Sequence, residues 1–173
     1  MSEKDLFMYR TDRIYVTRNH ELYAYLDGFA HKAKCLRNAA LFRVRNAFTA
    51  HNKTALTANE KEVQGELALL KGQKSYYVLG YGILQRLMRI TNNPDFFSRL
   101  PMQTAQHVIR QVCTDFKGWL DSLKKYRKDS SGYTGKPKMP GYCRNDTASY
   151  LFTNQDAVIY DGKLKLPRTK IRI

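Results

Sequence analysis

Cysteine is scarce in this sequence, which has only Cys35, Cys113 and Cys143 among its 173 residues. The three are odd in number and far apart, which excludes a disulfide framework and a zinc site built from paired CxxC motifs. A chain of this length can bury a core without cross-links, as one domain or as two small lobes. The cysteine pattern therefore predicts a reduced, cytoplasmic protein.

Long apolar runs are also missing. No stretch approaches the roughly 20 residues that a membrane span requires, and the start, MSEKDLFMYR, lacks the apolar segment of a secretory signal. We therefore expect no membrane partner and no export.

Acidic residues are few: 15 Asp and Glu face 30 Lys and Arg, for a net charge of +15. This excess favours a polyanionic partner, and nucleic acid over a membrane surface because no basic amphipathic anchor stands out. The chain also has 12 tyrosines and 8 phenylalanines, whose rings can stack on bases.

Apolar periodicity predicts four helices in the first three quarters of the chain. The first follows a possible cap at Asn19 and buries Leu22, Leu26, Phe29, Ala33, Leu36, Ala40, Val44 and Ala47 on one face. Its other face carries His31, Lys34, Asn38 and Arg45 and is mostly basic. Lys34 and Arg45 on this face are candidate contacts to a nucleic-acid backbone. Thr57 is a candidate cap for a helix within residues 54–71, residues 76–90 form a third helix, and Pro101 begins the fourth, which ends in KKYRK.

Strand-like segments lie at both ends of the sequence. Residues 6–16 and 149–153 are rich in β-branched and aromatic types, residues 157–160 and 163–166 flank an Asp161-Gly162 turn, and residues 170–173 begin another alternation. This order predicts an α+β fold: a small antiparallel β-barrel formed by the first strand and the C-terminal strands, interrupted by a helical lobe. The expected parts are residues 1–18, 19–131 and 132–173.

The segment GKPKMPGY, residues 135–142, can be neither helix nor regular strand. Its prolines predict a stiff, extended segment that displays Lys136, Lys138, Tyr142 and Arg144 to a phosphate backbone. The alternative is a linker with no binding role. Lys124, Lys125 and Arg127 of the KKYRK run either bind phosphates with it or only complement the helix dipole.

Three blocks in this order, LPMQTAQHVIRQVCTDFKGWLDSLKKYRK, YTGKPKMPGY and FTNQDAVIYDGKLKLP, resemble the amino-terminal half of TnpB, the OrfB product of bacterial insertion sequences. The resemblance covers residues 97–167. It implies an OB-like wedge barrel interrupted by a helical recognition lobe. It further implies an RNA-guided DNA nuclease of a bacterial or archaeal cell, associated with the nucleoid. Such a protein holds a guide RNA and reads a short motif beside a double-stranded DNA target.

The resemblance also implies positions for reading that motif. Gln106 matches a family reader on the fourth helix, where Gln103 and Arg110 are further candidates, and Thr153 and Asn154 match two more positions. Glutamine can pair bidentately with adenine, and Thr or Asn can meet base edges. Met102 stands where the family has lysine, so the motif read by this chain is expected to differ. The alternative is that Gln106 is an ordinary exposed helix residue and Asn154 an ordinary turn residue.

The catalytic parts of TnpB, a metal-binding RuvC domain and a zinc ribbon, would lie beyond these residues. No convincing acidic set or histidine spacing marks a metal site within the 173 residues. We therefore expect a portion that binds nucleic acid without cutting it and without a cofactor of its own. Divalent metal and zinc are expected only in the missing C-terminal part.

Two other functions remain open. The chain could be a guide-independent DNA-binding regulator or transposition accessory protein with a helix-turn-helix, or a module that binds another protein through its aromatic residues. An open sheet edge near Ile173 would also allow a homodimer.

Overall fold

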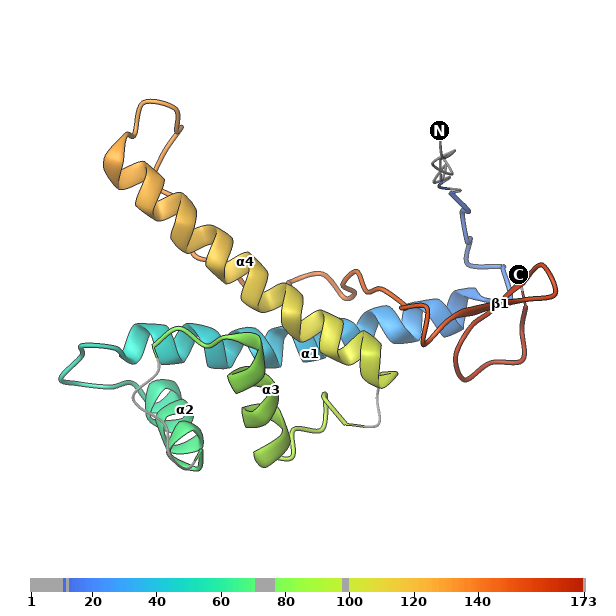
Figure 1. Cartoon of the computed structure of the whole chain (residues 1–173), viewed down its shortest axis with the longest axis horizontal. Coiled ribbons are helices and arrows are strands. Elements are labelled where there is room, and N and C mark those ends of the chain that lie inside the picture. The colour runs from blue at the N-terminus through green and yellow to red at the C-terminus, as the bar shows by residue number, and fades with distance from the viewer. Residues whose placement is uncertain (1–10, 12, 71–76, 98–99, 173) are drawn as a thin grey trace, which may run out of the picture.

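The computed structural model describes residues 11, 13–70, 77–97 and 100–172. Two long helices, α1 and α4, cross each other; α2 and α3 lie below α1 in Figure 1, and the C-terminal half of α4 extends above it. A hairpin lies near the N-terminal end of α1 (Figure 1). The elements are α1 (Tyr23–Ala50), α2 (Ala58–Ala68), α3 (Tyr81–Ile90), α4 (Met102–Lys128), β1 (Val158–Tyr160) and β2 (Lys163–Lys165).

The core lies between the apolar stripes of α1 and α4, which the sequence periodicity predicted. On α1 the buried members are Phe29, Ala33, Leu36, Ala40, Val44 and Ala47. On α4 they are Ala105, Val108, Ile109, Val112, Phe116 and Leu123. Since residues three and four apart share one helix face, each stripe covers one side of its helix and leaves the opposite side for other contacts.

The helix starts agree with the sequence in part. Thr57 caps α2 in a capping box with Glu60, as predicted. The expected cap at Asn19 is wrong: the chain turns once more before α1, and the Leu22 amide donates to Nδ1 of His20. The third helix begins after Gly80, later than predicted, and Pro101 occupies the N-cap of α4.

The predicted β-barrel is wrong, because the only sheet in the described residues is the antiparallel pair β1 and β2. Its turn is as predicted: Asp161 and Gly162 have φ of 51° and 68°, as a type I′ turn requires. Residues 149–153 are extended but have no strand partner, and Arg172 makes only an isolated bridge with Lys165. Residues 11 and 13–16 form no strand, and the rest of the predicted first strand lies outside the described residues.

A buried ion pair joins α1 to α2. Nη2 of Arg43 lies 2.5 Å from Oε1 of Glu66, and the two side chains are 8% and 14% exposed. Arg43 also donates to the Ala39 carbonyl, whereas its Nε and the second Glu66 oxygen have no hydrogen-bond partner among the described residues. Each charge in this pair therefore depends on the other for compensation.

We expect Glu66→Leu to lower the free energy of unfolding by about 3–5 kcal/mol, because it leaves the Arg43 charge buried and unpaired. Adding Arg43→Met should recover most of the loss, since both charges are then removed. Urea denaturation of the two variants measures this difference. Asp115→Leu, which breaks the more exposed pair with Arg37, is the control and should cost about 1 kcal/mol or less. A single Glu66→Leu variant as stable as the parent would contradict the account.

The cap of α2 also predicts a dependence on pH. The Lys53 ammonium, together with the Thr57 amide and the Thr49 hydroxyl, lowers the pKa of Glu60 from 4.5 to about 2. The folded state thus binds the proton less readily than the unfolded chain, so this stability is present above about pH 4.5 and is lost as the pH falls toward 2.

We expect Glu60→Gln to reduce the loss of thermal stability on acidification, because its side chain does not titrate. Melting temperatures followed by circular dichroism between neutral and acidic pH measure the effect. Glu62→Gln removes an exposed charge from the same helix and is the control. Identical acid profiles for the parent and Glu60→Gln would refute the assignment.

Candidate nucleic-acid interface

Residues 137–150, here called the strap, run along the polar face of α1. Arg45 donates to the Pro140 carbonyl (2.6 Å), and Asn38 both donates to the Cys143 carbonyl (3.1 Å) and accepts from the Cys143 amide (2.9 Å). Nδ1 of His31 lies 3.0 Å from the Asp146 carbonyl. These helix residues are seven apart and their strap partners three apart. Seven helical residues rise about 10.5 Å and three extended residues span about 10 Å, so the two repeats stay in register.

Both ends of the strap are anchored as well. Nε1 of Trp119 on α4 donates to the Pro137 carbonyl (3.1 Å). At the other end the Ala148 amide donates to the Ala30 carbonyl, and the Tyr150 hydroxyl donates to the Leu26 carbonyl. Burial, with a smaller contribution from Tyr25, raises the pKa of Tyr150 to about 12, so its proton stays in place at neutral pH. The strap is therefore bound to both long helices along its length.

The strap and the residue before it present the predicted phosphate-binding side chains to solvent. Lys136, Lys138, Tyr142 and Arg144 are all exposed. Arg45, which the sequence placed among the phosphate contacts, has its guanidinium engaged by the Pro140 carbonyl and lies 5.3 Å from the Tyr142 ring centroid.

The basic end of α4 adjoins the start of the strap, because Trp119 lies only one to two turns before Lys124, Lys125 and Arg127. All three cations are exposed, and Lys124 lies 3.7 Å from Asp121. The last-turn cations both complement the helix dipole and remain accessible, so the two interpretations of KKYRK are compatible. Lys34 is half-buried on α1, between His31 and Asn38.

The predicted base-reading residues come from two segments that a buried clasp brings together. Oγ1 of Thr104, fully buried near the start of α4, lies 2.9 Å from the Asp156 carboxylate and 3.1 Å from the Leu151 carbonyl. The Thr153 carbonyl accepts from the Asp156 and Ala157 amides, which closes the turn that contains Asn154. This turn is thereby held against α4.

Around this clasp the side chains differ in access. Gln103 and Gln106 flank Thr104 in sequence and are half-buried, as is Thr153, whereas Asn154 is exposed. Arg110 is exposed one turn further along α4, with its guanidinium 4.8 Å from the Tyr81 ring centroid. Neither Thr104 nor Asp156 is among the site residues predicted from the sequence. A threonine at a core position of an apolar helix is the signal that could have indicated a buried polar contact.

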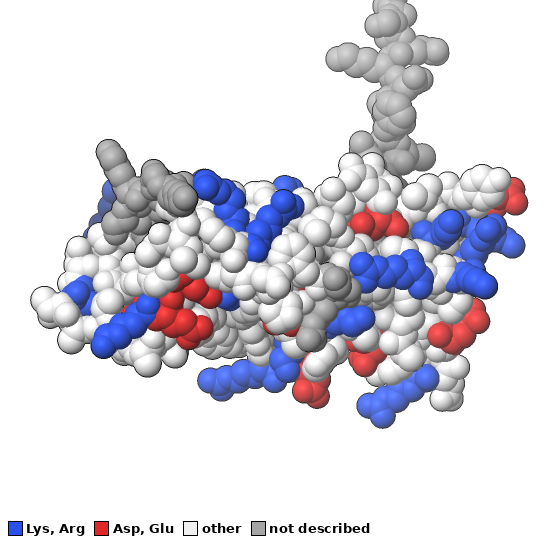
Figure 2. All heavy atoms as spheres, turned by 90° about the horizontal axis from the view of Figure 1, so that it is seen from below, with Lys and Arg blue, Asp and Glu red and all other residues white. Residues whose placement is uncertain are grey.

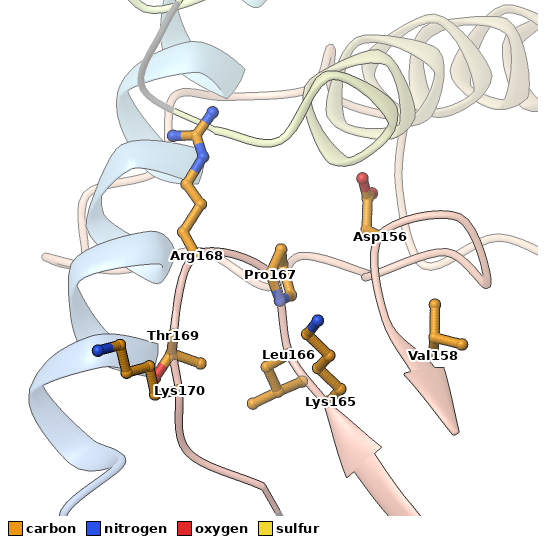
Figure 3. A pocket seen from close by; sticks show the side chains of 8 residues that line it. All are labelled: Asp156, Val158, Lys165, Leu166, Pro167, Arg168, Thr169 and Lys170. Carbon is orange, nitrogen blue, oxygen red and sulfur yellow. The ribbon is translucent and has the colours of Figure 1, made fainter. Parts of the chain in front are cut away.

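A pocket of about 560 Å³ lies beside the hairpin (Figure 3). It is lined by Asp156, Val158, Lys165, Leu166, Pro167, Arg168, Thr169 and Lys170. Arg168 points toward the loop before α4, where it donates to the Leu100 carbonyl, and Lys170 points away from Lys165 (Figure 3). The cations therefore do not converge on one ligand position.

The described residues contain no group of three or more His, Cys, Asp or Glu side chains that could hold a metal ion. Burial raises the pKa of the Cys113 thiol to about 11, which makes it a poor nucleophile at neutral pH.

On the face seen in Figure 2, basic and acidic side chains are interspersed. Among the described helices, none has the length and apolar character to cross a membrane.

Comparison of this chain with protein-family models, with curated proteins and with solved structures finds no match.

We expect Asn38→Ala to release the middle of the strap, because the change removes both hydrogen bonds to Cys143. At about 1 kcal/mol for each bond, exchange of the Cys143 amide hydrogen should quicken by about tenfold or more. This exchange rate is measured by hydrogen–deuterium exchange with detection by mass spectrometry or NMR. The control is Asn46→Ala on the same helix, whose side chain donates to the Phe42 carbonyl of that helix. Unchanged exchange in Asn38→Ala would show that the hydrogen bonds from Asn38 do not hold the strap.

Proposed function

We propose that the strap and the basic end of α4 form a surface that binds the phosphate backbone of nucleic acid. The observation that carries this is the fixed backbone of the strap, held by Arg45, Asn38 and His31. Lys138 and Arg144 project from that backbone into solvent. Because the backbone is already ordered, binding costs less conformational entropy than it would on a free loop.

Charge supports nucleic acid as the partner. The net charge is +15, and both the strap and the last turns of α4 carry exposed cations. Phosphate contacts of this kind release counterions and make binding sensitive to salt. In line with the resemblance to TnpB, we propose that these residues bind nucleic acid and that cleavage belongs to the nuclease domain of a whole TnpB-like protein.

With the resemblance to TnpB, we infer a more specific role: the nucleic-acid-binding portion of a TnpB-like transposon-encoded protein. It would hold a guide RNA on the basic surface and read a short target-adjacent DNA motif with residues of α4 and of the Asn154 turn. Gln106 and Asn154 carry amide groups suited to adenine or other base edges. The clasp supports this role because it holds the Asn154 turn against the helix that carries Gln106.

The guide-binding role is tested by purifying the chain from cells that express the flanking transposon end. RNA that remains bound through a high-salt wash is then sequenced. We expect one discrete RNA that ends at the element boundary. A random mixture, or none, would reject the guide-binding role and favour the guide-independent DNA-binding regulator, which predicts a sequence-specific footprint on duplex DNA by the protein alone.

The backbone-binding surface itself yields a separate prediction. Changing Lys136, Lys138 and Arg144 together to Ala should weaken binding to RNA and duplex DNA, because each side chain neutralises a phosphate. The slope of log affinity against log salt should fall by about 2 to 3. Fluorescence anisotropy titrations at several salt concentrations measure both quantities.

The matched control changes three exposed cations of α2 and α3, Lys61, Arg86 and Arg89, to Ala. This variant loses the same charge on helices that lie on the other side of α1 from the C-terminal half of α4 (Figure 1). We expect its affinity and salt slope to stay close to those of the parent. Equal losses in the two triple variants would mean that net charge, and not the strap, governs binding.

A further inference from the structure

Two exposed tyrosine rings, Tyr142 and Tyr77, are each supported on one side by a residue at the C-terminal end of α1. Arg45 lies 5.3 Å from the Tyr142 ring centroid, and the His51 ring stacks on Tyr77 with centroids 4.2 Å apart and planes inclined by 16°. Tyr142 and Tyr77 remain 44% and 46% exposed. A flat ring supported from behind and open in front is the arrangement on which an unpaired base stacks.

A continuous set of aromatic contacts connects the two rings to the strap. Phe48 lies 6.4 Å from Tyr77 and 5.3 Å from Trp119, measured between ring centroids. Trp119 in turn donates to the Pro137 carbonyl at the start of the strap. Phe48 lies on α1 midway in sequence between Arg45 and His51, which are about 9 Å apart along a regular helix. The two tyrosines are therefore linked through the end of α1 and the aromatic residues packed on it.

Basic side chains accompany these rings. Lys138 lies between the two anchored carbonyls of the strap, that of Pro137 on Trp119 and that of Pro140 on Arg45. Lys138 and the neighbouring Lys136 are exposed. The surface thus combines stacking faces with cations that can neutralise the phosphates between stacked nucleotides.

We propose that Tyr77 and Tyr142 form a stacking platform for unpaired nucleotides, with Lys136 and Lys138 binding the phosphates. This inference rests on the proposed nucleic-acid function and names the kind of strand that the surface takes. In a duplex the bases already stack on one another, so a duplex can use the lysines but not the rings. The platform therefore selects single-stranded over double-stranded nucleic acid.

The test compares Tyr77→Leu and Tyr142→Leu with Tyr77→Phe and Tyr142→Phe, because phenylalanine keeps the stacking face and leucine removes it. Affinities for oligouridine RNA, oligothymidine DNA and a DNA duplex are measured by fluorescence anisotropy. Each leucine variant should bind the single strands about 5- to 100-fold more weakly. The phenylalanine variants should bind them more nearly like the parent, and in the leucine variants duplex affinity should fall far less than single-strand affinity.

Tyr160→Leu is the matched control. Tyr160 is 67% exposed on the hairpin, and the Arg172 guanidinium lies 5.9 Å from its ring centroid, so it has the same chemistry outside the platform. It should leave all three affinities unchanged. Circular dichroism establishes that each variant is folded. If the Tyr77→Leu variant is not folded, the inference is tested with Tyr142→Leu, which changes a residue on the exposed strap.

The outcomes separate this inference from the proposed function. Single-strand binding that weakens in the lysine and arginine triple variant but not in the leucine variants would overturn the platform and leave the basic surface standing. A parent that binds no nucleic acid would overturn both. Loss with RNA and DNA single strands alike supports a platform for any unpaired strand, and loss with RNA alone supports one for unpaired RNA.

Discussion

The backbone of the strap must find hydrogen-bond partners outside a sheet, and the rest of the interface depends on how α1 provides them. An extended segment without a neighbouring strand leaves its carbonyl and amide groups unpaired, which is costly wherever water is excluded. Arg45, Asn38 and His31, which are seven residues apart, meet four of these groups. The rise of the helix and the length of the extended chain agree over this interval, so one helix face holds the strap without strain.

This arrangement gives α1 two tasks on opposite faces. Its apolar stripe packs in the core with α4, and its polar face fixes the strap. The same helix therefore determines where Lys138 and Tyr142 are displayed, and its C-terminal end supports Tyr77 through His51. Near the N-terminal end of α4, Thr104 bonds to Asp156 and so holds the turn that contains Asn154 against the helix. Rigid helices thus position side chains that lie on segments with almost no regular secondary structure of their own.

Local patterns in the sequence were reliable where the structure they describe is itself local. The Thr57 capping box and the Asp161-Gly162 hairpin depend on neighbours within a few residues, and both are present. The barrel was wrong because strand pairing is a long-range contact. The alternation of residue types in residues 149–153 does not determine whether the segment pairs with another strand or packs on a helix. Here Tyr150 and Phe152 pack on Phe29, and the Ala148 amide donates to α1.

The sequence by itself determined the helices, their apolar faces, the hairpin turn, the stiffness of the strap and the excess of positive charge, because each follows from nearby residues or from composition. Only the tertiary structure decided the role of the polar face of α1. Arg45 lies 95 residues before Pro140 in the chain, and Asn38 lies 105 before Cys143. No periodicity encodes a hydrogen bond between a helix side chain and a distant backbone carbonyl. The exposed cations of the strap were therefore recognisable in the sequence, whereas the residues that hold them in place were recognisable only in the fold.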